Sequence, residues 1–172
     1  SYLKTEEKYS WIKSPLYDDT RVEVGPLARI AVGLAAGDER ISKYATKFLA
    51  PLQIAKAKQS LAGIHLAKQN YSLALQILLD AQATIEKTSD GFALAQLNYD
   101  LAESFAYLKK YDDAFLYFEK AQSFYNSITA SPDSIFGMYR FAKAIEREFQ
   151  HEALIIVEQA IEQMLTIHSK LA

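Results

Sequence analysis

The sequence predicts an all-α protein in which antiparallel helix pairs form an array, preceded by an irregular N-terminal arm that leads into a helix. Two observations predict the array. The chain aligns with itself at an offset of 40 residues, and after position 50 its apolar side chains recur at helical spacing. A third observation predicts the arm, because residues 8–33 combine Pro, Gly, Trp and β-branched residues instead. We therefore divide the chain into residues 1–50 and 51–172, with the junction at Pro51.

The arm is expected to be extended and then helical. Trp11, Tyr17 and several β-branched residues precede Gly25 and Pro26, and a proline at an early helical position loses no hydrogen bond. Extended arms are stable when they dock on something, here the helical array or another polypeptide. We expect Trp11, Tyr17 and Arg29 to make that docking contact.

The same stretch has a family resemblance. "YSWIKSPLYDD" followed by "VEVGPLAR" resembles an internal segment of the large subunit of nickel-iron hydrogenases, in which Trp-x-Lys-x-Pro-Arg-Tyr precedes Glu-Val-Gly-Pro-Leu-Ala-Arg. Leu16 departs from that pattern, since the family usually has Arg there. The resemblance covers residues 8–50 and implies hydrogenase subunits as candidate partners.

The resemblance does not imply hydrogenase chemistry in these residues. The family holds nickel and iron with two Cys-x-x-Cys pairs, and this sequence has 0 cysteines. We therefore predict no catalytic residue, no metal ligand and no cofactor, and a chain that is not an enzyme.

The repeat begins after the junction. Residues 61–82 align with residues 101–122, and the small residues and a tyrosine keep exact register. Small residues in register mark points where two helices approach closely. The matched pairs include Tyr71/Tyr111, Ala74/Ala114, Ala81/Ala121 and Gln82/Gln122.

A weaker third copy follows in residues 141–163, with Ala153 and Ala160 at equivalent positions and a connection one residue different in length. Each unit is predicted to be a helix, a short polar turn and a second helix; the turns fall around Asn70, before Tyr111 and around His151. Ser89 or Asp90, and Ser131 or Pro132, are start signals for the following helices.

These units resemble the tetratricopeptide repeat (TPR), which has a large-small pair in its first helix, an aromatic residue before its second and alanines seven apart within it. The copy beginning at Leu101 and Ala102 fits at each position, and the likeness covers residues 51–172. The unit here is near 40 residues, longer than the usual ~34. The resemblance implies an α-α superhelix whose first helices form a concave, partner-binding surface.

The partner of such a surface would be a peptide or protein. The expected lining residues are Gln96, Tyr99, Glu103, Tyr107, Tyr139, Arg140, Lys143 and Glu146, although the same pattern fits a solvated helix face equally well. A terminal-carboxylate clamp of Lys, Asn and Arg, known in the family, is not reproduced, because Gln59 and Gly63 stand at its first positions.

Composition excludes other classes. Net charge is -2 with acidic and basic residues interspersed, so nucleic acid is not an expected partner. No apolar run reaches the ~18 residues that span a bilayer. The 3 histidines lie on separate predicted helices without nearby carboxylates in ligand spacing, which argues against a metal role. We expect a soluble protein, with the cytoplasm favoured over the periplasm.

Three functional hypotheses remain open. The first is a non-enzymatic protein- or peptide-binding scaffold associated with a hydrogenase complex or its assembly. The second is a fragment or chimaera of a hydrogenase large subunit, and the third is a peptide-sensing regulatory domain. The origin of the two parts is open as well: a natural accessory protein, a composite chain, or a diverged hydrogenase fragment, which the 40-residue register disfavours. Self-association is expected if the apolar residues 154–157 lack cover.

Overall fold

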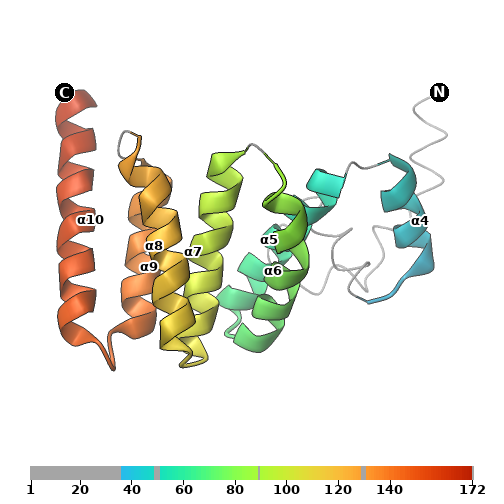
Figure 1. Ribbon diagram of the computed structural model, residues 1–172, viewed down its shortest axis with the longest axis horizontal. Coiled ribbons are helices and arrows are strands. Elements are labelled where there is room, and N and C mark those ends of the chain that lie inside the picture. The colour runs from blue at the N-terminus through green and yellow to red at the C-terminus, as the bar shows by residue number, and fades with distance from the viewer. Residues whose placement is uncertain (1–35, 49–50, 89, 129–130, 172) are drawn as a thin grey trace.

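The computed structural model describes residues 36–48, 51–88, 90–128 and 131–171, and within these ranges every regular element is an α-helix (Figure 1). The all-α prediction is therefore confirmed. The arm residues Trp11, Tyr17 and Arg29 lie outside the described residues. The helices are α4 (Glu39–Phe48), α5 (Pro51–Ala67), α6 (Tyr71–Ile85), α7 (Gly91–Tyr107), α8 (Tyr111–Asn126), α9 (Pro132–Ile145) and α10 (Gln150–Leu171).

Six of these helices form the predicted pairs. The pairs are α5 with α6, α7 with α8 and α9 with α10, and they stack because α7 packs on α6 and α9 packs on α7. In Figure 1 α10 stands at one end of the row and α4 at the other. The repeat register found in the sequence thus corresponds to a stack of helix pairs.

The turns inside the first two pairs have the same backbone geometry, 40 residues apart. Gln69 and Lys109 have φ angles of 62° and 60°, in the left-handed region. The amide of Asn70 donates to the carbonyl of His65 at 2.8 Å, and the amide of Lys110 donates to that of Phe105 at 2.9 Å. These bonds define Schellman motifs, which usually use Gly at the left-handed position. The turn of the third pair, residues 146–149, is one residue longer and lacks this conformation.

Two of the predicted helix starts are confirmed as side-chain caps. The Asp90 carboxylate accepts a hydrogen bond from the amide of Ala93 at 3.0 Å. The Ser131 hydroxyl accepts one from the amide of Ser134 at 3.3 Å, and Pro132 takes the first helical position. Both caps satisfy amides that have no partner inside their own helix.

The alanines that keep register are buried. Ala74, Ala81, Ala114, Ala121, Ala153 and Ala160 are 0–6% exposed. They lie on the second helix of each pair, where it meets its first helix. A larger side chain at any of them would separate the paired helices, so the pattern of small residues sets the packing distance.

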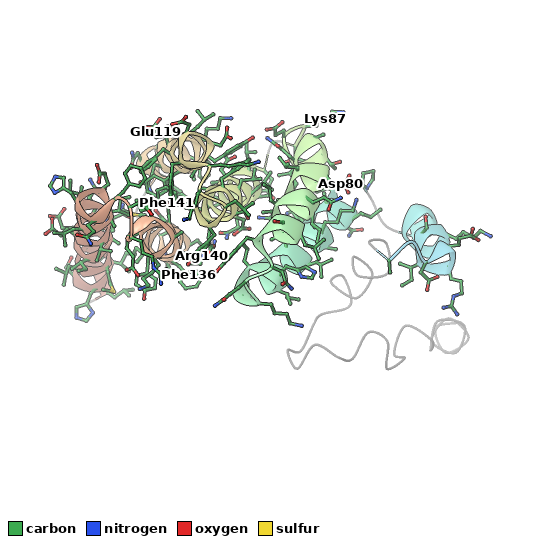
Figure 2. All side chains as sticks on the ribbon, turned by 90° about the horizontal axis from the view of Figure 1, so that it is seen from below. Asp80, Lys87, Glu119, Phe136, Arg140 and Phe141 are labelled. Carbon is green, nitrogen blue, oxygen red and sulfur yellow. The ribbon has the colours of Figure 1, made fainter. Side chains whose placement is uncertain are left out.

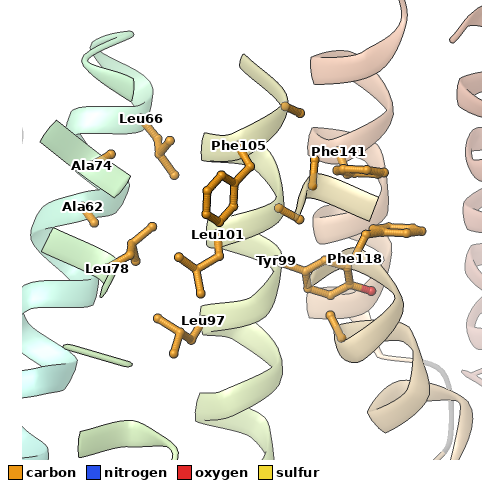
Figure 3. Close-up of a cluster of buried hydrophobic side chains, with 14 of the residues drawn as sticks. Ala62, Leu66, Ala74, Leu78, Leu97, Tyr99, Leu101, Phe105, Phe118 and Phe141 are labelled. Carbon is orange, nitrogen blue, oxygen red and sulfur yellow. The ribbon is translucent and has the colours of Figure 1, made fainter. Parts of the chain in front are cut away.

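The core has a layer on each side of α7 (Figure 3). Leu97, Leu101 and Phe105 face the first pair, where Ala62, Leu66, Ala74 and Leu78 lie. On the opposite side, Tyr99 lies among Phe118, Tyr125 and Phe141. The central helix therefore buries both faces, and it is the most completely buried helix of the array.

Candidate functional site

A groove lies across the first helices of the three pairs and is the candidate binding site. It has a volume of about 480 Å³. We call it the first-helix groove; its lining includes Lys56, Gln59, Ser60, Gly63, Asp90, Phe92, Gln96, Asp100 and Arg140, from α5, α7 and α9 and the cap of α7. The first helices thus line a shared concavity, as a helix-pair stack predicts.

Two charged residues that line this groove, Asp100 and Arg140, meet a third, Glu103, one turn further along α7, and we call the three the ion cluster. Nη2 of Arg140 donates to Oδ1 of Asp100 at 2.7 Å, and Nη1 lies 2.9 Å from Oε2 of Glu103. Asp100 is 4% exposed and Glu103 is 8% exposed. Arg140 therefore bridges α9 to α7 through two buried carboxylates.

Neighbouring amide groups complete the environment of Asp100. Nε2 of Gln59 donates to Oδ2 at 3.2 Å, and Nε2 of Gln96 lies 3.5 Å from Oδ1. The guanidinium of Arg140 also lies 5.3 Å from the centre of the Phe136 ring, and Figure 2 shows these two side chains beside each other on α9. Asp100 is thus hydrogen-bonded from three helices.

Glu103 is less well satisfied than Asp100. Among the described residues, its buried Oε2 has an ion-pair distance to Arg140 but no hydrogen bond of acceptable geometry, and Nε of Arg140 is also buried without a partner. Burial raises the pKa of Glu103, Asp100 raises it further, and Arg140 opposes both. Burial works against the charge of Arg140, but the two carboxylates outweigh it and the pKa of the guanidinium is raised.

The structure brings together three of the residues expected on the concave face. Gln96 and Arg140 line the groove, and Glu103 pairs with Arg140 in the ion cluster without lining the groove itself. Tyr107 is half-buried nearby, where its pKa is raised by burial and then by the Glu103 carboxylate. Its ring stacks on Tyr71 with centroids 4.1 Å apart.

The other expected residues do not line the groove. Tyr99 is 1% exposed, and its hydroxyl accepts a hydrogen bond from Gln122 at 2.6 Å, so it is a core residue. It reaches the core because Gly137 has no side chain: a Cβ there would lie 2.4 Å from the Tyr99 ring. Tyr139 faces α10 instead, in a separate apolar hollow. Lys143 and Glu146 pair with each other at 2.8 Å beside α10.

Several groove residues were not among those expected. Asp100 is the most important, and its signal in the sequence is an acidic pair three residues apart, Asp100 and Glu103, inside a helix that has no other charged residue. Lys56 and Asp90 join α5 to the cap of α7 through a salt bridge of 2.8 Å. Phe92 lines the groove and is 56% exposed.

The side chains that could bind a metal do not cluster in the part of the chain that the structure describes. Within the described residues, no group of three or more His, Asp or Glu side chains could hold a metal ion. The sequence has 0 cysteines, so the thiolates that a nickel-iron centre needs are missing from these 172 residues. In the same part of the chain, no helix is both long and apolar enough to cross a bilayer.

Solved structures share the fold of the array. Two crystal structures of a putative kinesin light chain from Podosopora anserina, with nearly identical TPR-like repeats, superpose with TM-scores of 0.58 and 0.56. Each is 16% identical in sequence; the first covers 96% of this chain and 92% of its own. This likeness confirms a TPR-like fold.

Sequence comparison points to a different family. The quinone-reactive Ni/Fe-hydrogenase large chain of Wolinella succinogenes is 62% identical over 42 residues, which is 24% of this chain and 7% of that protein. The hydrogenase-2 large chain of Escherichia coli K12 is 48% identical over 46 residues, 27% of this chain and 8% of that one.

The chain thus spans less than a tenth of the length of these curated relatives. The family match itself is longer, because the model of the nickel-dependent hydrogenase family matches residues 1–105, and therefore includes α5, α6 and most of α7. By this match over more than half of its length, the chain belongs to the nickel-dependent hydrogenase family, and the helices that follow its N-terminal segment have a TPR-like fold.

Proposed function

We propose that the helical array is a non-enzymatic module that binds a peptide or protein segment in the first-helix groove, and that this segment contributes a basic group. The observation that supports the proposal is the ion cluster, in which Asp100 and Arg140 line a groove of about 480 Å³. Stacked helix pairs expose such a surface to partners, and groove-binding peptides are held by a few anchored side chains.

Charge balance favours a basic group. Lys56 and Asp90 neutralise each other, while the single guanidinium of Arg140 faces the two carboxylates of Asp100 and Glu103. When both carboxylates are ionised, the cluster has a net negative charge. A lysine, arginine or N-terminal ammonium near Glu103 would balance that charge and give its buried oxygen a donor.

Phe92 supplies the apolar part of the site. Its ring is 56% exposed at the groove and packs edge-on against Phe124 at 5.0 Å between ring centres, so it is held in place although it faces solvent. Exposed aromatic rings on a rigid support are typical anchors of protein interfaces. A segment with an apolar residue near a basic one fits this arrangement.

The hydrogenase match supports a role for the N-terminal segment. We propose that residues 8–50 associate with a hydrogenase complex or its assembly, because this segment contains the hydrogenase-like motifs of the sequence and lies within the family match to residues 1–105. A fragment of a hydrogenase large subunit is the second candidate, supported by the family match to residues 1–105. A peptide-sensing regulator is supported by the fold likeness alone, which is weak support for function.

Selection of binding peptides tests the groove. Random 12-residue peptides displayed on phage would be selected against the full chain, and the affinities of enriched sequences measured by fluorescence anisotropy. We expect enrichment of Lys or Arg beside an apolar residue. Glu103→Gln should weaken binding by about tenfold, since it removes one charged hydrogen-bond acceptor.

Phe92→Ala should also weaken binding. The matched control is Leu116→Ala on α8, because Leu116 is 48% exposed and lies outside the groove. Enriched peptides without a basic residue, or affinities unchanged by both Glu103→Gln and Phe92→Ala, would contradict the proposal.

Affinity purification tests the N-terminal segment separately. The full chain and a version beginning at Pro51 would be used as baits in the source cell, followed by mass spectrometry of retained proteins. Hydrogenase subunits retained only by the full chain would support the association. Equal retention of the same unrelated proteins by both baits would contradict it.

A further inference from the structure

A second groove lies between α9 and α10, at the end of the array, and it is apolar. Its volume is about 620 Å³, and its lining includes Phe136 and Tyr139 from α9 and Ile161, Met164 and Leu171 from α10. These side chains are 45–82% exposed. Apolar side chains gathered at this density are typical of a surface that another polypeptide covers.

The fold shows what kind of element covers such a groove. The equivalent surface of the first pair is covered by α7, and that of the second pair is covered by α9. In both cases the cover is an α-helix. Among the described residues, no helix lies on the α9–α10 groove, so a helix is the element expected to fill it.

The sequence of α10 is arranged for pairing with another helix. Leu154, Val157, Ile161, Met164, His168 and Leu171 follow one another at alternating spacings of three and four residues, which is a heptad pattern with a single polar position. All of them line the two hollows between α9 and α10. At 22 residues α10 is also the longest described helix, about 33 Å in length.

The charges of α10 favour a second copy in antiparallel orientation. Glu158 directly follows the apolar seam position Val157 in the first half of α10, whereas Lys170 lies beside the seam residue Leu171 in the last turn; Glu152 and Glu162 lie on the outer side of the helix. Two antiparallel α10 helices oppose their helix dipoles and place Glu158 of one copy near the C-terminal turns of the other, which contain Lys170. Two parallel copies would place like charges together. The same helix therefore offers both halves of one interface.

We propose that two copies of this chain associate through the α9–α10 groove, with their α10 helices antiparallel and their α9 helices flanking them as a four-helix bundle. Each α10 fills the groove of the other copy with Ile161 and Met164 near the two-fold axis, as an isologous interface requires. The first-helix groove lies on other residues and stays available in this dimer.

Sedimentation equilibrium of the full chain tests the proposal, at concentrations from about 1 to 200 μM, which bracket the affinity of a small helical interface. We expect a monomer–dimer equilibrium. Ile161→Glu should weaken the dimer by more than about 30-fold, because it places a charge at the centre of an apolar interface.

Ile155→Glu is the matched control. Ile155 is 40% exposed, against 45% for Ile161, and lies on the same helix but lines neither hollow. It should leave the dimer unchanged, while circular dichroism checks that both variants keep their helices. A monomer at every concentration, or an equal effect of the two variants, would overturn the proposal; the former is also the result expected if a helix of another protein covers the groove.

Cross-linking tests the orientation, since the chain has 0 cysteines of its own. A chain with Leu154→Cys mixed with a chain with Leu171→Cys should form a disulfide-linked pair on oxidation, because antiparallel helices bring these ends together. Each variant alone should cross-link little. Efficient linkage of the Leu154→Cys chain to itself would show a parallel pair and overturn the antiparallel arrangement.

Discussion

Arg140→Met is the substitution with the largest expected effect on stability, because it leaves two buried carboxylates without their cation. Asp100 and Glu103 are 4% and 8% exposed, so water cannot replace the lost guanidinium efficiently. Removing one member of a buried ion pair costs about 3–5 kcal/mol. The Arg140 side chain is itself 18% exposed, which places the expected loss near about 3 kcal/mol, the lower end of that range.

Urea unfolding followed by circular dichroism at neutral pH measures this loss, and thermal unfolding should show a melting temperature lower by about 6–12 °C. A triple variant, Arg140→Met with Asp100→Asn and Glu103→Gln, should recover most of the stability, since no unpaired charge remains. Lys143→Met is the control, because its exposed pair with Glu146 contributes little. An Arg140→Met variant no less stable than Lys143→Met would refute the role assigned to the ion cluster.

Four further substitutions test the packing, the backbone strain and the electrostatics. Glu103→Gln should stabilise the chain at neutral pH but not near about pH 4. Burial, as the main cause, raises the pKa of Glu103 in the folded chain, so folding favours the protonated carboxyl and this stabilisation is lost as the pH rises through that pKa. The amide of Gln stays neutral at every pH and avoids this loss. Gly63→Ala should raise the free energy of unfolding by about 0.5–1 kcal/mol, because a Cβ there meets nothing within 4 Å. Gly137→Ala should lower it by about 1 kcal/mol, since overpacking against Tyr99 exceeds the gain in helix propensity. Lys109→Gly should raise it by up to about 1 kcal/mol, because the left-handed turn position then has no Cβ to strain.

Each of these predictions has a contrary result. A constant difference in stability between Glu103→Gln and the parent chain across the pH range would exclude the raised pKa. Equal effects of the two glycine substitutions in urea unfolding would contradict the close approach of Tyr99 to Gly137. A destabilising Lys109→Gly would show that the side chain of Lys109 contributes more than its backbone strain costs.

The pairing of helices was predictable from the sequence because it depends on local signals. The alanines in register, the caps at Asp90 and Ser131 and the turn before Tyr111 all act within a few residues of their own position. Such local signals determine where each helix begins and ends whatever the rest of the chain packs against. The exact 40-residue register therefore gave the first two helix pairs, whereas for the third copy only a connection of different length was expected, and the structure shows that its turn is one residue longer.

The groove was predicted less completely because it depends on contacts between helices far apart in the chain. Arg140 meets Asp100 across 40 residues, and only the packing of α9 on α7 brings them together. Tyr99 was expected on the surface, but the missing side chain of Gly137 opens a place for its ring in the core. Tyr139 faces α10 because of how α9 is rotated against α7, and helical spacing in the sequence does not determine that rotation.

The most direct test of the proposed binding site is to map it at residue level. A peptide selected on the full chain would be titrated into isotope-labelled protein while its backbone amide resonances are recorded by NMR. We predict that the largest shifts occur at Ser60, Gly63, Ala93 and Gln96, which line the first-helix groove. Shifts confined to the second helices α6 and α8, with these four amides unchanged, would contradict a binding site in that groove.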